Sequence, residues 1–166
     1  MRRYLVVANQ TLGGTHLVAK VRECLGNGEC RFSIVVPATP PRHRLTWTES
    51  DASALAKARL EAALARFREL GAEVEGGVGD AHPLDAIGDA LRDEPFDEII
   101  LSTLPPGASR WLKADLPLRV RAKFGLPVTH IIGGAETERA PGAGFPEQWI
   151  ADPSKGAGRW HTRTGR

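Results

Sequence analysis

The chain has 166 residues, of which 42% are hydrophobic and 25% are charged, and its formal net charge is +2. This length and composition fit one globular domain with a single core. The small net charge and the scattered arginines argue against nucleic acid or an anionic membrane as a partner. No apolar run approaches the ~20 residues that span a bilayer, and the first residues lack a signal-peptide core, so we expect a cytoplasmic protein.

Apolar runs predict strands, and apolar residues at helical spacing predict helices between them. The predicted strands are 3–9, 30–38, 72–78, 96–103 and 126–132. The first predicted helix begins at Thr15 and stops at Gly26, and the second runs over 51–70. The third begins at Pro83 and stops at Pro95, and the fourth begins behind Asp115 and ends at Gly125. Thr48 and Asp51, at the start of the second helix, have the spacing of a capping box.

The alternation of strands and helices predicts an α/β fold, a five-stranded and mostly parallel sheet with helices on both faces. Residues 1–132 form this predicted domain. Residues 133–166 are a Gly/Pro-rich tail without periodicity. We expect the tail to be disordered or to be held to the domain by Phe145, Trp149 and Trp160.

The two cysteines, Cys24 and Cys30, fit neither a zinc motif nor a redox pair, because their spacing is wrong and no further cysteine exists. Cys24 lies on the apolar side of its helix, so we interpret it as a small core residue. The five histidines are far apart in the sequence. We therefore expect no metal site.

A ligand crevice is expected where the carboxyl ends of the strands meet, because open α/β sheets bind ligands where the strand order reverses. The candidate binding residues are Asn9 and Gln10 after the first strand, Val36 and Ala38 at the second, Ser102 and Thr103 at the fourth, and Gly107, Arg110 and Lys113 beyond it. The alternative interpretation is that the Pro-Pro-Gly segment is a rigid turn whose neighbouring hydroxyls only satisfy backbone groups.

Other segments give weaker signals. Arg42-His43-Arg44 with Trp47 forms either a binding loop over the same crevice or a solvated loop. Gly13-Gly14 is interpreted as a tight turn, because no P-loop or Gly-x-Gly-x-x-Gly motif follows. Asp80-Ala81-His82 is interpreted as a helix cap. No Gly-x-Ser-x-Gly motif is present, so binding is favoured over catalysis. The alternative is an enzyme in which neighbouring strand ends combine Asn9, Ser102 and His43 in space, for which the spacing gives no support.

The segments "VVAN" (6–9), "DEIILST" (97–103) and "GLPVTHI" (125–131) resemble the universal stress protein family. The resemblance covers about residues 3–132. It implies a Rossmann-like domain, ATP binding in many members, and a homodimer formed by pairing of the last strand. Here that strand, "PVTHII", is apolar and short enough to serve as such an edge.

The chain departs from the pattern of the ATP-binding members. They carry an aspartate at the end of the first strand, where this chain has Asn9, and glycines near the positions of Ser102 and of Pro105 or Pro106. Proline removes an N–H donor that a phosphate cradle needs. The family's Gly-Ser pair aligns with Ala114 and Asp115, and an aspartate that caps the next helix is expected to occupy its free amides and repel a triphosphate.

These observations predict a small cytoplasmic accessory or ligand-sensing protein, related to the stress response, that does not bind ATP in the family's usual mode and carries no cofactor. A second hypothesis is a protein that binds a nucleotide (AMP or ATP) or another small anion through an altered site of Asn9, Ser102, Thr103 and Arg110. A third is a non-catalytic interaction module with the tail as its contact element. An open crevice favours binding, and one filled by Leu104, Trp111 or the tail favours the module.

Overall fold

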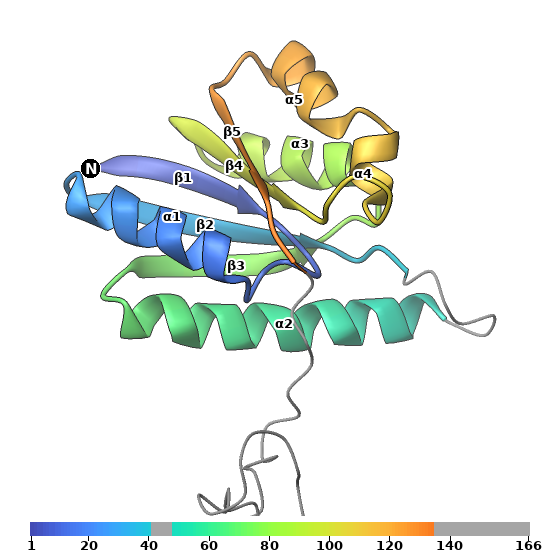
Figure 1. The fold of residues 1–166 in the computed structure, drawn as a ribbon, viewed down its shortest axis with the longest axis horizontal. Coiled ribbons are helices and arrows are strands. Elements are labelled where there is room, and N and C mark those ends of the chain that lie inside the picture. Colours follow the sequence, from blue (N-terminus) through green and yellow to red (C-terminus); the bar gives the residue numbers. More distant parts are fainter. Residues whose placement is uncertain (41–47, 135–166) are drawn as a thin grey trace, which may run out of the picture. The chain divides into compact units, whose positions relative to one another are not determined.

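Strands and helices alternate along the chain, as the sequence predicts (Figure 1). The computed structural model describes residues 1–40 and 48–134. The strands are β1 (Arg2–Val7), β2 (Cys30–Pro37), β3 (Glu73–Gly79), β4 (Glu98–Thr103) and β5 (Val128–Ile132). The helices are α1 (Thr15–Gly26), α2 (Glu49–Glu69), α3 (Pro83–Asp93), α4 (Arg110–Lys113) and α5 (Leu116–Phe124).

The five strands form one sheet in the order β3-β2-β1-β4-β5, and every neighbouring pair is parallel. Val6 of β1 pairs with Ile34 on one side and with Ile100 on the other. The chain builds outward from β1 first through β2 and β3, and then through β4 and β5. The strand order therefore reverses between β1 and β4, and this is where an open sheet leaves room for a ligand.

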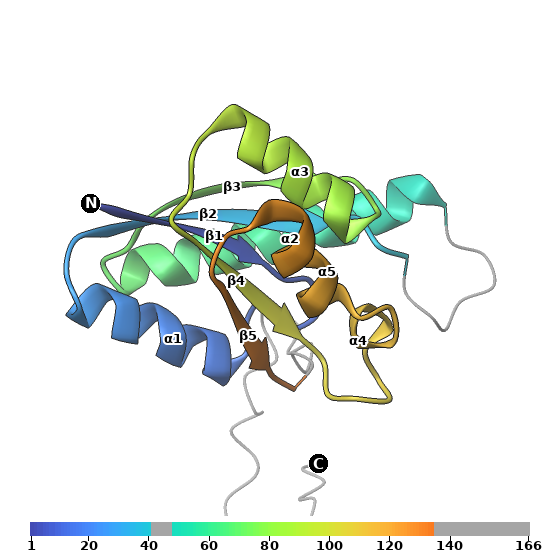
Figure 2. The ribbon, with the colours of Figure 1, turned by 90° about the horizontal axis from the view of Figure 1, so that it is seen from above.

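Helices cover both faces of the sheet, so the predicted fold class is confirmed (Figures 1 and 2). Side chains of β1 alternate between the two faces, as in any strand. Tyr4 and Val6 pack in a buried cluster with residues of α1 and α2. Leu5 and Val7 pack in a second buried cluster with residues of α3 and α5. The two apolar clusters fix the sheet between its helices and hold the strand ends in place.

Local signals in the sequence explain several element ends. Thr48 caps α2 through a capping box, in which its side chain accepts a hydrogen bond from the backbone of Asp51 and the Asp51 side chain accepts one from the backbone of Thr48. Pro83 stands in the first turn of α3, where its missing N–H is not needed. Cys24 and Cys30 are buried, and both thiols are free. The capping box, the position of Pro83 and the burial of Cys24 in the core are therefore confirmed.

The segment before α5 differs from the prediction. Asp115 precedes α5, but its side chain makes no capping hydrogen bond, and its backbone is left-handed with φ of 49°. The reason is an extra turn of helix, α4, which the sequence analysis did not predict and which Ser109 caps by accepting from the backbone N of Leu112 over 3.2 Å. Asp115 is exposed after this turn, so it does not occupy amides at the crevice.

Two predictions fall on residues outside the described part of the chain. The loop with Arg42, His43, Arg44 and Trp47 lies there, and so do the aromatic residues of the predicted tail. The described helices include none that is long and apolar enough to cross a membrane.

Candidate functional site

A cavity of about 680 Å³ lies at the carboxyl ends of β1 and β4. Its walls come from the loops that follow these strands, from the segment that leaves β2 and from helices α2 and α4. The lining residues are Asn9, Gln10, Thr11, Thr39, Pro40, Arg59, Ser102, Thr103, Leu104, Pro105, Gly107, Ala108, Ser109, Arg110, Trp111 and Gly134. The cavity therefore occupies the point where the strand order reverses.

Asn9 joins three elements beside the cavity. It follows β1 and is buried, with 9% of its surface exposed. Its side-chain nitrogen donates to the carbonyl oxygen of Pro37, at the end of β2, over 2.8 Å. Its side-chain oxygen accepts from Nη1 of Arg59, on α2, over 2.6 Å. Both ends of the amide are thus satisfied, and Asn9 has a fixed orientation.

Hydroxyl groups form the inner part of the cavity. The Oγ1 atom of Thr11 and the Oγ atom of Ser102 lie 2.7 Å apart and share a hydrogen bond. Both residues are buried, with 2% and 1% of their surfaces exposed. This bond connects the loop after β1 to the end of β4, so the two strand ends that border the cavity are held together by side chains as well as by the sheet.

Thr103 connects the cavity to the edge strand β5. Its hydroxyl lies 2.8 Å from Nε2 of His130 and also donates to the carbonyl oxygen of Leu104 over 3.1 Å. Burial, with a smaller contribution from the Arg121 cation, holds the pKa of His130 below the usual range of a histidine. The imidazole is therefore neutral at pH 7 and can donate its Nε2 proton to the hydroxyl.

The Pro-Pro-Gly loop is a compact turn. The backbone N–H groups of Ala108 and Ser109 both donate to the carbonyl oxygen of Pro105, each over 3.1 Å. Gly107 has φ of 91°, a left-handed conformation that favours glycine. The loop thus uses its own amides for its internal hydrogen bonds.

Positive charge reaches the cavity from two helices. Arg59 of α2 is partly buried, and Arg110 of α4 is exposed and donates from Nη1 to the carbonyl oxygen of Pro40 over 3.1 Å. Among the described residues that line the cavity, these two arginines are the ones with ionisable side chains. The ionisable side chains of the described walls are therefore both cationic.

Six of the nine predicted binding residues line the cavity: Asn9, Gln10, Ser102, Thr103, Gly107 and Arg110. The other three lie outside the lining. Val36 is fully buried in the cluster beneath α1 and α2 because its side chain points to that face. Ala38 lies beside β3, where its N–H donates to the carbonyl oxygen of Gly79. Lys113 is exposed at the end of α4, outside the lining.

Sequence reasoning missed Thr11, Thr39, Ser109 and above all Arg59. Arg59 lies in the middle of a helix 50 positions from Asn9 in the sequence, and no local pattern marks it. Leu104 and Trp111, which were considered as possible plugs, are part of the wall of the cavity.

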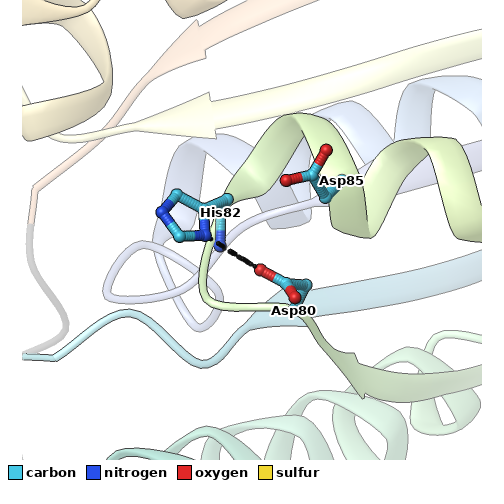
Figure 3. A group of neighbouring side chains, drawn as sticks. All are labelled: Asp80, His82 and Asp85. Atoms are coloured by element: carbon cyan, nitrogen blue, oxygen red, sulfur yellow. Dashed lines mark hydrogen bonds and ion pairs between the residues drawn. The ribbon is translucent and has the colours of Figure 1, made fainter.

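A second group of polar residues lies at the start of α3 (Figure 3). Potential ligand atoms of Asp80, His82 and Asp85 all lie within 4.8 Å of one another, and all three residues are exposed. Oδ1 of Asp80 accepts from the backbone N of His82 over 2.7 Å and lies 3.1 Å from its Nδ1. These hydrogen bonds lower the pKa of Asp80. They are the contacts of a turn that leads into a helix, and we assign the group no further role.

Comparisons place the fold among known structures. No protein-family model matches the chain, and no curated protein sequence matches it. A universal stress protein from Archaeoglobus fulgidus is similar with a TM-score of 0.55 at 20% identity, over 79% of this chain and 93% of its own. A universal stress protein in complex with cAMP gives 0.57 at 16% identity, over 80% and 98%. A universal stress protein family protein from Arabidopsis thaliana with AMP bound gives 0.56 at 11% identity, over 85% and 97%. The chain has the universal stress protein fold.

Proposed function

We propose that this chain is a small ligand-sensing or accessory protein whose cavity between β1 and β4 holds a nucleoside monophosphate or a similar small anion. The cavity itself carries the proposal. Its volume of about 680 Å³ lies within the range of small-molecule sites. Its walls combine hydroxyl groups, two guanidinium groups and the apolar surfaces of Leu104 and Trp111, which suits a ligand with an anionic end and an apolar ring.

The place of the cavity supports the same proposal. Ligands of open parallel sheets bind outside the carboxyl ends of the strands, where the strand order reverses. Two proteins with this fold contain AMP and cAMP, as reported above. We propose a nucleotide of that size for this chain, acting as a signal in the cytoplasm during a stress response.

The Pro-Pro-Gly loop supports a binding mode without a glycine cradle. Pro105 and Pro106 have no N–H to donate, and the amides of Ala108 and Ser109 already bond to Pro105. A phosphate chain laid along this loop finds few backbone donors, whereas guanidinium and hydroxyl groups elsewhere in the lining can donate to a single phosphate. We therefore propose that ATP is not held in the manner of the ATP-binding universal stress proteins.

Thermal unfolding with added nucleotides tests the function. A ligand at 100 times its dissociation constant stabilises the folded chain by about 2.7 kcal/mol, which gives a clear rise in melting temperature. We expect AMP or cAMP to produce such a rise at millimolar concentration and ATP with magnesium to produce a smaller one. If none of them shifts the melting temperature, the proposed function is wrong.

We further propose a homodimer through the edge strand β5. One edge of β5 pairs with β4, and it is the last strand in the sheet order, so its other edge has no neighbour among the described strands. Ile132 in this strand has 46% of its surface exposed. Sedimentation at micromolar concentration is expected to give twice the chain mass, and Ile132→Lys is expected to shift it toward the monomer. A monomeric parent protein contradicts the dimer.

A further inference from the structure

The geometry points to a two-arginine anion site, in which Arg59 and Arg110 hold a phosphate monoester in this cavity without a divalent cation. The inference rests on the proposed function and deepens it, because it names the residues that recognise the anion and the charge that they supply. It also separates this site from one in which a glycine loop and a metal ion hold a triphosphate.

Arg59 is held in place before any ligand binds. Its guanidinium donates to the side-chain oxygen of Asn9 over 2.6 Å, and Asn9 is itself fixed by its bond to Pro37. Arg59 is partly buried, so its charge acts where water screens it less than on an open surface. A preorganised cation at the wall of a cavity loses little side-chain entropy when an anion binds.

Arg110 reaches the same region from the other side of the sheet. It is the first residue of α4, and its Nη1 donates to the carbonyl oxygen of Pro40 over 3.1 Å. Pro37, the partner of Asn9, is the last residue of β2 and lies three positions before Pro40. Contacts with residues 37–40 therefore place both guanidinium groups. Arg110 contacts this segment directly, and Arg59 is linked to it through Asn9.

The charges match a phosphate monoester. Such a group carries a charge between about −1.5 and −2 at pH 7, and Arg59 and Arg110 together carry +2. Each guanidinium has five N–H donors in a planar fork and can contact a protein acceptor and a phosphate at the same time. The arginines thus supply the positive charge that Mg²⁺ supplies in many nucleotide sites. Binding is therefore expected to be independent of magnesium.

Titration calorimetry of the full chain with AMP, and separately with inorganic phosphate, tests the inference. We expect the same affinity in buffer with EDTA and in buffer with magnesium. Arg59→Met and Arg110→Met should each weaken AMP binding by about tenfold or more, because each removes charge-assisted hydrogen bonds. Lys57→Met on α2 and Lys113→Met on α4 are matched controls, since both lysines are exposed and lie outside the lining. They should leave affinity unchanged.

Arg59→Lys separates charge from packing. It keeps the positive charge but not the planar fork of donors, so it should recover only part of the affinity that Arg59→Met loses. The melting temperature of the free protein shows whether either variant is misfolded. Arg110 is exposed, so Arg110→Met gives a readout even if both Arg59 variants unfold. AMP binding that needs magnesium and is insensitive to Arg59→Met and Arg110→Met overturns the two-arginine site and leaves the proposed function intact. No binding of AMP or phosphate in either buffer overturns both.

Discussion

The guanidinium of Arg59 and the side-chain amide of Asn9 are joined by a hydrogen bond of 2.6 Å at the wall of the cavity. The bond links the middle of α2 to the end of β1, and Asn9 extends it to the end of β2 through Pro37. Because asparagine is neutral, it orients the arginine without cancelling its charge. The aspartate that the family resemblance leads one to expect at this position would instead form an ion pair.

Asn9→Asp is therefore expected to weaken anion binding. The new carboxylate lies beside Arg59, neutralises part of its charge and repels a phosphate, so AMP affinity should fall by about tenfold. Asn27→Asp is the matched control, because Asn27 follows α1 as an exposed residue outside the cavity and undergoes the same change of charge. Equal affinities of Asn9→Asp and the parent chain, measured by calorimetry, would remove the basis for an electrostatic role of Arg59.

A pH dependence of stability is expected from His130. Its pKa is lowered in the folded chain, chiefly by burial, while in the unfolded chain it has the ordinary value of about 6.5. The unfolded chain therefore binds the proton more readily, and the stabilisation is present above about pH 6.5 and is lost as the pH falls toward the folded value. Urea unfolding at pH 7.5 and at pH 5.5 measures this loss of stability.

The variant His130→Gln separates the contribution of His130 to this pH dependence from that of the carboxylates. Glutamine does not titrate and can still donate to the Thr103 hydroxyl. The parent should lose more stability than His130→Gln between pH 7.5 and 5.5. An identical loss of stability in both proteins would contradict this role of His130.

Gly76 is expected to be required for packing between α2 and the sheet. A Cβ atom at this position would collide with the carbonyl oxygen of Ile34 and lie 2.9 Å from Cδ1 of Leu60. Gly76→Ala should therefore lower the free energy of unfolding by about 1–3 kcal/mol. The next residue, Gly77, has no atom within 4 Å of such a Cβ, so Gly77→Ala should have little effect. Similar denaturation midpoints for both variants would show that the sheet shifts to accommodate the methyl group.

The fold could be predicted from the sequence because its signals are local. Runs such as "YLVVA" are apolar on both faces of the strand, and turns follow them at regular intervals, so the alternation of elements is visible without tertiary information. The capping box of Thr48 and Asp51 is local in the same sense. The structure moves several strand ends by one or two residues, for example from 3–9 to Arg2–Val7.

The candidate site could be predicted only in part, because its parts meet through tertiary packing. Asn9, Ser102 and Thr103 lie at strand ends, and the topology alone places these together. Arg59 reaches the cavity from within a helix, which depends on how α2 lies across the sheet. The capping role given to Asp115 failed for a similar reason, since the sequence did not show the short α4, and after it Asp115 makes no capping hydrogen bond. The sequence likewise does not show which face of the sheet the side chain of Val36 joins, and in the structure it packs in the cluster with residues of α1 and α2.

The proposed domain boundary can be tested by truncation. A chain that ends at Gly134 keeps all residues of both described apolar clusters. It also keeps the N–H of Gly133, which donates to the carbonyl oxygen of Thr103 over 2.9 Å. We expect this shortened chain to retain a cooperative thermal transition and near-UV circular dichroism. Loss of the near-UV signal with retained far-UV signal would mean that residues beyond 134 belong to the core.

The central claim is that a small anion binds in the cavity between β1 and β4, and mapping of amide chemical shifts tests it most directly. The isotope-labelled chain is titrated with AMP in the presence of EDTA, and each backbone amide signal is followed. The account predicts that the largest shifts fall on Ser102, Thr103, Ser109 and Arg110, and that Arg59→Met greatly reduces them at the same AMP concentration. Shifts that concentrate on the groove of α3 and α5 around Leu84 and Phe124, or shifts that the variant leaves unchanged, would contradict it.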